Sequence, residues 1–122
     1  MDRLFISSLW LIVLDQLSKH IIHGTKNYGA AFGILQGYRI IFIIIGLAAL
    51  WILIYNKKHF HDLGIYGYVL LISGTIGNLI DRIFLGYVRD FINVGFWPSF
   101  NLADTFNTIG VFLIIIYFWE KT

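Results

Sequence analysis

The chain has 122 residues, of which 58% are hydrophobic and only 13% are charged, and its mean hydropathy is +0.76. Soluble domains rarely combine these values, whereas integral membrane proteins routinely do. The net charge of +2 is too small to indicate nucleic-acid binding, and the absence of cysteine excludes disulfides and thiol nucleophiles. With a single proline and no low-complexity segment, residues 1–122 are predicted to form one domain.

Apolar segments predict an all-α integral membrane protein. The segments run over Leu4–Ile22, Ile40–Tyr55, Leu63–Ile80 and Thr105–Trp119. A helix needs roughly 20 residues, and at least about 17, to cross the hydrocarbon, so we expect the second and fourth to extend into the interfaces. Soluble core helices are the alternative for such short segments. Four of them joined by almost no amphipathic sequence favour four transmembrane helices.

The first apolar segment could be mistaken for a signal peptide. No small-x-small cleavage site follows it, and the polar run Asp15–Lys19 follows instead. It is therefore interpreted as a membrane helix. Four spans place both termini on one face, together with Lys57 and Lys58. Lysine and arginine number four on that face and five on the other, so the positive-inside rule does not settle the orientation.

Most of the acidic residues gather at the face opposite the termini. The polar residues expected there are Asp15, Asp81, Asp90, Asp104, Asn27, Asn78 and Asn101. An ionisable group near the bilayer is costly and is a functional-site candidate by default. Two carboxylates brought together can share a proton and serve as acid and base. This gathering predicts a site at the membrane surface.

Structural roles compete with a functional one for several of these residues. Asn78 and Asp81 are three apart and share a helix face, but Asp81 and Arg82 could simply mark a helix end at the interface. Arg82 could also pair with a carboxylate elsewhere. Either Asn101 or Asp104 could be the N-cap of the last helix, whereas capping does not explain Asp90.

Two further pairs favour structural interpretations. Asp15 and Lys19 are four apart, which predicts an ion pair within the first helix. Ser18 and Lys19 are neighbours that do not face each other, which argues against a Ser/Lys dyad. His59 and His61 are expected to be solvated, and with no third ligand in view no metal site and no cofactor are predicted.

The small residues of 27–33 predict close packing or a tight re-entrant turn. With the other polar segments, they carry a resemblance to a known family. The chain resembles the lipoprotein signal peptidases (signal peptidase II), which are bacterial aspartyl peptidases. The matching motifs, in the family's order, are Asp15-Gln16-Leu17-Ser18-Lys19, Asn27-Tyr28-Gly29-Ala30-Ala31-Phe32-Gly33, Gly74-Thr75-Ile76-Gly77-Asn78-Leu79-Ile80-Asp81-Arg82, Gly86-Tyr87-Val88-Arg89-Asp90-Phe91-Ile92 and Phe100-Asn101-Leu102-Ala103-Asp104.

The resemblance implies a fold, an activity and a set of site residues. It implies four transmembrane helices in the bacterial inner membrane, cytoplasmic termini and a site facing the periplasm. The implied substrate is a diacylglyceryl-modified prolipoprotein in contact with membrane lipid, cut before the lipid-bearing cysteine. Globomycin is the implied inhibitor, and a monomer is the default. The implied catalytic pair is Asp90 and Asp104; the implied supporting positions are Asn27, Asn78, Asp81, Arg82 and Asn101, with Asp15 more structural.

The chain departs from the family pattern in two places. Ser73-Gly74 stands where the family usually has two glycines. Only His20 to Lys26 separate the first two motifs, where the family usually has a longer segment folded into a small β-cradle. We therefore expect a trimmed β or loop element over the site.

Two other functions remain open from the residues. A small ion or proton transporter would also carry intramembrane carboxylates, but it would place them near the midplane of its spans. A non-catalytic homologue that binds lipoprotein precursors would follow if the trimmed cradle had cost activity. Proton or solute flux in liposomes would distinguish the first, and a cleavage assay the second.

Overall fold

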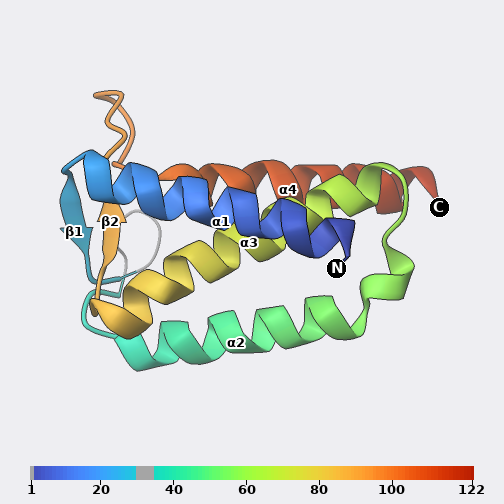
Figure 1. Cartoon of the computed structure of the whole chain (residues 1–122), viewed down its shortest axis with the longest axis horizontal. Coiled ribbons are helices and arrows are strands. Elements are labelled where there is room, and N and C mark those ends of the chain that lie inside the picture. The colour runs from blue at the N-terminus through green and yellow to red at the C-terminus, as the bar shows by residue number, and fades with distance from the viewer. Residues whose placement is uncertain (1, 30–34) are drawn as a thin grey trace.

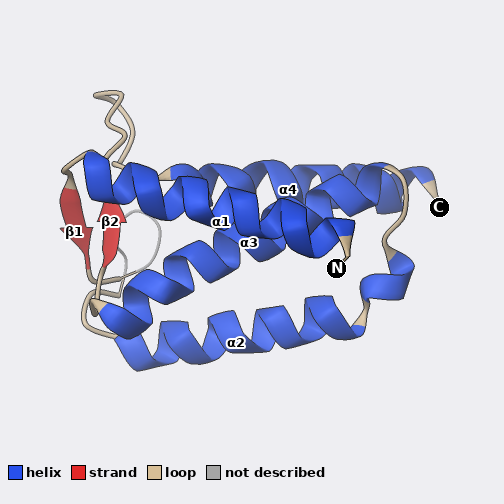
Figure 2. Cartoon of the chain, viewed as in Figure 1, coloured by secondary structure: helices blue, strands red, loops and turns tan. Residues whose placement is uncertain are grey.

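The computed structural model describes residues 2–29 and 35–122. Four helices form the body, with two short strands at one end (Figures 1 and 2). In chain order the elements are α1 (Arg3–Ile21), β1 (Thr25–Asn27), α2 (Arg39–Tyr55), the 3-10 helix η2 (Lys57–His59), α3 (Leu63–Phe84), β2 (Val88–Asp90) and α4 (Leu102–Glu120). Residues 30–34, part of the predicted re-entrant turn, lie outside the described residues.

The helices have the length and composition of a membrane protein. Within the described residues, α1, α3 and α4 have 19, 22 and 19 residues and are apolar enough to span a bilayer. The remaining helix, α2, has 17. It is about 25 Å long at 1.5 Å per residue, somewhat less than the roughly 30 Å hydrocarbon core. The predicted all-α membrane fold is thus confirmed, with α2 at the short limit.

Helix α3 lies at the centre and contacts the other three helices. Half of its apolar span is buried inside the protein, compared with 11% for α1 and 17% for α4. Small residues allow this. A Cβ atom on Gly67 would lie 2.7 Å from the Gly110 carbonyl oxygen, and a Cβ on Gly110 would lie 2.8 Å from that of Gly67. The backbones of α3 and α4 therefore touch, as small residues permit between membrane helices.

Helices α3 and α4 are longer at the strand end than the hydropathy predicted. Helix α4 begins at Leu102 rather than Thr105 because Asn101 and Asp104 form a capping box. The Asn101 side chain accepts from the Asp104 amide at 2.8 Å, and the Asp104 side chain accepts from the Asn101 amide at 3.1 Å. Asn101 is thus the cap, and Asp104 lies within the first turn.

The predicted β element is a two-stranded antiparallel sheet of three residues per strand. Thr25 pairs with Asp90 and Asn27 pairs with Val88. Gly24 is required before β1 because a Cβ there would collide with the Asp90 carbonyl. A hairpin follows β2, is closed by the bridge between Ile92 and Phe100, and projects from the bundle (Figure 1). Both termini lie at the opposite end, as an even number of spans requires (Figure 1).

Candidate active site

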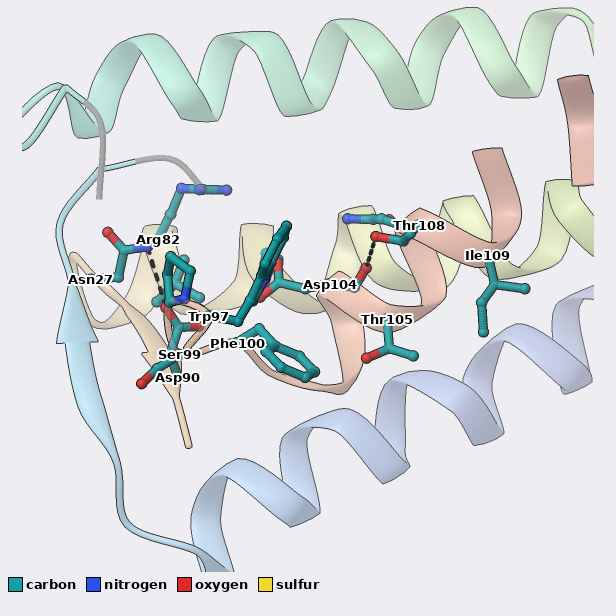
Figure 3. A pocket seen from close by; sticks show the side chains of 14 residues that line it. Asn27, Arg82, Asp90, Trp97, Ser99, Phe100, Asp104, Thr105, Thr108 and Ile109 are labelled. Atoms are coloured by element: carbon teal, nitrogen blue, oxygen red, sulfur yellow. Dashed lines mark hydrogen bonds between the residues drawn. The ribbon is translucent and has the colours of Figure 1, made fainter. Parts of the chain in front are cut away.

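Asp90 and Asp104 line one cavity at the strand end of the bundle (Figure 3). Asp90 is the last residue of β2, and Asp104 lies in the first turn of α4. The cavity has a volume of about 480 Å³. Its other lining residues are Asn27, Asn78, Arg82, Val88, Trp97, Pro98, Ser99, Phe100, Thr105, Asn107, Thr108 and Ile109. Two carboxylates that lie 14 residues apart in the sequence therefore share one space.

Asn101 links the two carboxylates. Its Nδ2 donates to Asp90 Oδ1 at 2.9 Å, and its backbone N–H donates to Asp104 Oδ2 at 3.1 Å. The Asn101 side chain is fully buried. Its position is therefore fixed by the capping box, and it fixes the carboxylates relative to each other.

Asn78 approaches Asp104 from α3. Its Nδ2 donates to Asp104 Oδ1 at 2.9 Å. Its Oδ1 accepts from Lys19 Nζ at 3.1 Å and from Asn101 Nδ2 at 3.0 Å. Because two donors hold the oxygen, the amide can present only its nitrogen to Asp104.

Asn27 holds Asp90 from the other side. Its Nδ2 donates to Asp90 Oδ2 at 3.2 Å, as Figure 3 shows. Burial and then the negative charge of Asp104 raise the pKa of Asp90 to about 6, against the opposing hydrogen bonds from Asn27 and Asn101. A carboxyl with this pKa exchanges its proton near neutral pH, as acid–base chemistry requires.

Asp81 lies behind the cavity wall in a buried charge cluster. Lys19 Nζ is 2.7 Å from Asp15 Oδ2 and 3.3 Å from Asp81 Oδ2. Arg89 Nη2 lies 2.9 Å from Asp81 Oδ1 and also donates to Gln16 Oε1 at 2.9 Å. Two cations thus balance two carboxylates, which permits their burial.

Asp15 is fully buried and connects α1 to the rest of the bundle. The predicted ion pair with Lys19 is confirmed. Asp15 Oδ1 also accepts from the Ala103 amide at 2.9 Å, which ties α1 to the start of α4. The Ser18 hydroxyl donates to the Asp15 carbonyl oxygen at 2.8 Å, an ordinary contact within a helix.

Arg82 lines the cavity but does not pair with a carboxylate among the described residues. Its Nη2 donates to the Gly29 carbonyl oxygen at 3.2 Å, and its guanidinium lies 5.2 Å from the Phe42 ring. Asp81 pairs with Lys19 and Arg89 instead. Arg82 lies in the same cavity as Asp90 and Asp104 but forms no ion pair with either carboxylate.

Sequence reasoning did not single out Gln16 or Arg89. Both lie inside the matched motifs, so the motifs contained the signal. Strand alternation could also have found Arg89, because neighbouring strand residues point to opposite sides. With Asp90 facing the cavity, Arg89 had to face the helices behind it. Among the described residues, no cluster of His, Cys, Asp or Glu could hold a metal ion.

The fold and the cavity define a membrane-embedded protein with a carboxylate pair, Asp90 buried and Asp104 partly buried, at one end of a helix bundle. The family model described as signal peptidase (SPase) II matches residues 21–120. The chain therefore belongs to the signal peptidase II family and is a membrane-embedded peptidase. The matched region includes the whole cavity lining.

Curated relatives and solved structures agree with this assignment. The chain is 43% identical to the lipoprotein signal peptidase of Halothermothrix orenii over 107 residues, covering 84% of this chain and 74% of the relative. It is 39% identical to the lipoprotein signal peptidase of Streptococcus pyogenes serotype M5, and the alignment covers 98% of this chain and 95% of the relative. Two solved bacterial membrane enzymes superpose with TM-scores of 0.87 and 0.81, at 32% and 33% identity. The superpositions cover 87% and 94% of those two structures, and 96% and 98% of this chain.

The comparison with the streptococcal relative bears on the shortened segment. Its alignment spans 144 positions, more than the 122 residues of this chain. The alignment must therefore contain positions that this chain lacks.

Proposed function

We propose that this protein removes the signal peptide from diacylglyceryl-modified prolipoproteins, cutting before the lipidated cysteine, with Asp90 and Asp104 as the catalytic pair. The observation that carries the proposal is that Asn101 donates to both carboxylates at once. Such a link holds the two acids in one cavity, where the charge of Asp104 raises the pKa of Asp90, as an aspartyl mechanism requires.

One carboxylate is ionised and takes a proton from water, while the other is protonated and polarises the scissile carbonyl. The resulting hydroxide adds to the carbonyl carbon. The C–N bond then breaks as a proton passes to the leaving amine, which becomes the amino group of the lipidated cysteine. The raised pKa of Asp90 supports a shared proton in the pair.

The remaining predicted site residues act as supports. Asn27, Asn78 and Asn101 orient the carboxylates through their amides. Asp81 and Asp15 anchor the helices behind them, and Arg82 lines the cavity wall. Apolar lining from Trp97, Phe100 and Ile109 suits a substrate that arrives from the lipid. Globomycin is expected to inhibit by occupying this cavity.

A gel-shift cleavage assay in detergent tests the proposal. A diacylglyceryl-modified prolipoprotein is mixed with wild type, Asp90→Asn and Asp104→Asn. Both variants should lose cleavage, because the amide cannot exchange the proton. Asp62→Asn is the matched control and should cleave normally, since Asp62 precedes α3 at the other end of the bundle. Cleavage by either folded site variant would refute the pair.

Binding and flux measurements on the same protein distinguish two other functions. A folded wild-type protein that binds but does not cleave would indicate a precursor-binding homologue. Proton flux in liposomes would indicate a transporter, but the placement of Asp104 in the first turn of its helix, rather than midway along it, argues against one.

The proposed location is the bacterial inner membrane, with cytoplasmic termini and the cavity at the outer face, and the proposed state is a monomer. Because the chain contains no cysteine, a single introduced cysteine reports on orientation. A cysteine at Thr122 should resist a membrane-impermeant maleimide in intact cells, and one at Lys26 should react. The reverse pattern would refute the orientation.

A further inference from the structure

The cavity continues along α4 beyond the carboxylates. Asp104, Asn107, Thr108 and Ile109 all line it. Asn107 lies three positions after Asp104 in the helix, about 4.5 Å further toward the middle of the span. The cavity therefore holds a polar side chain deeper in the membrane than the proposed reacting centre.

The Asn107 carboxamide is not satisfied within the protein. Its Oδ1 is buried and has no hydrogen-bond partner among the described residues. It occupies the space that a Cβ atom on Gly74 would take, against α3. Oδ1 is thus held against the helix, and Nδ2 is left on the cavity side with no acceptor in the described part of the chain.

Neighbouring polar groups on the same wall behave differently. The Thr105 hydroxyl donates to the Asn101 carbonyl oxygen at 3.2 Å, and the Thr108 hydroxyl donates to that of Asp104 at 2.9 Å. Each hydroxyl therefore already has a backbone acceptor one helical turn earlier. The Asn107 Nδ2 donor differs from both hydroxyls because it has no acceptor among the described residues, so an acceptor brought by a ligand can pair with it.

We propose that Asn107 forms a subsite that donates a hydrogen bond to a carbonyl oxygen of the bound substrate. This inference rests on the proposed function and identifies one group of its substrate. A lipidated precursor offers two sources of such an oxygen, the ester linkages of its diacylglyceryl group and its peptide backbone. The depth of Asn107, below the carboxylates and beside Ile109, favours the ester.

Binding in the inactive Asp90→Asn background tests the subsite without turnover. Two fluorescent lipopeptides are compared, one with ester-linked and one with ether-linked chains. Adding Asn107→Leu should weaken binding of the ester lipopeptide by about 3- to 10-fold, the value of one hydrogen bond. It should leave the ether lipopeptide unchanged. Equal weakening of both would support the subsite with the peptide carbonyl as its partner.

Two controls separate recognition from structure. Asn56→Leu makes the same replacement of an amide at the other end of the bundle, outside the cavity, and it should change neither affinity. Asn107→Leu should keep or raise the melting temperature, because it removes an unpaired polar group, and Asn107→Ala provides a variant that cannot crowd Gly74. A purely structural residue would not weaken binding while the protein became more stable.

The outcomes are distinct. Unchanged ester affinity in both Asn107 variants would overturn the subsite and leave the proposed function standing. No binding of either lipopeptide to the Asp90→Asn protein would overturn the proposed function and this subsite with it.

Discussion

The two ends of the bundle carry the same kind of ion pair in opposite surroundings. At the strand end, Lys19 lies 2.7 Å from Asp15, and both side chains are fully buried. At the other end, Lys57 lies 2.7 Å from Asp2, and both side chains are 47% exposed. Equal distances do not mean equal contributions to the free energy of unfolding. Solvent screening and the loss of side-chain freedom offset the gain from an exposed ion pair. Removing one partner of a buried pair is strongly destabilising, because it leaves a buried charge uncompensated.

The difference extends to what each pair supports. Lys19 also donates a hydrogen bond to the Asn78 oxygen, so that the Asn78 nitrogen is the atom that faces Asp104. The Lys57 side chain instead pairs with Asp2, the residue that caps α1. The buried cluster is therefore part of the candidate site's scaffold, and the exposed pair is a local contact at a helix end.

Asn101→Ala should produce the largest effect at the strand end after loss of the aspartates themselves. The substitution removes the side-chain amide that donates to Asp90 and the oxygen that caps α4, while the backbone N–H that donates to Asp104 remains. Asp90 loses its position, and a misplaced reacting group can cost about 100-fold in rate. Cleavage of the lipidated precursor measures this. Asn56→Ala, which removes an amide from the other end of the bundle, should leave the rate unchanged. A full rate with Asn101→Ala would mean that the carboxylates hold their positions without it.

Lys19→Met should destabilise the fold by about 3 to 5 kcal/mol, because it leaves Asp15 and Asp81 buried without this cation. Lys57→Met should leave stability unchanged within error, because its partner is solvated. Denaturation in detergent, followed by circular dichroism, measures both. Similar stability losses in the two variants would remove the distinction between the ends.

The smallest effect concerns pH and Asp90. Its pKa of about 6 in the folded protein is above the ordinary value of 3.8, so the folded state binds this proton more tightly than the unfolded state. The stability that this provides is present below about pH 4 and is lost as pH rises through 6. Asp90→Asn should therefore raise the melting temperature relative to wild type at pH 8. The difference should shrink toward zero at pH 4.

Melting curves from pH 4 to 8 measure that difference, with Asp62→Asn as the exposed control. A gap between Asp90→Asn and wild type that stays constant with pH would show that Asp90 does not titrate in this range.

Much of the candidate site could be predicted from the sequence. The motifs marked Asp90, Asp104, Asn27, Asn78 and Asn101, and all five meet around one cavity. The ends of the helices were predicted less accurately. Hydropathy ended the third span at Ile80 because Asp81 and Arg82 are polar, yet α3 continues to Phe84, since Asp81 is neutralised by residues from other elements.

The sequence by itself determined the membrane fold and the end of the bundle at which polar groups gather. Apolar runs in a bilayer must form helices, because only a helix satisfies its own backbone, and four spans bring alternate connections to one face. Only the tertiary structure decided the partners. Asp81 pairs with Arg89 and Lys19 rather than with Arg82, and the Asn107 oxygen lies unpaired against Gly74. These contacts join different elements of the fold, so hydropathy does not specify them.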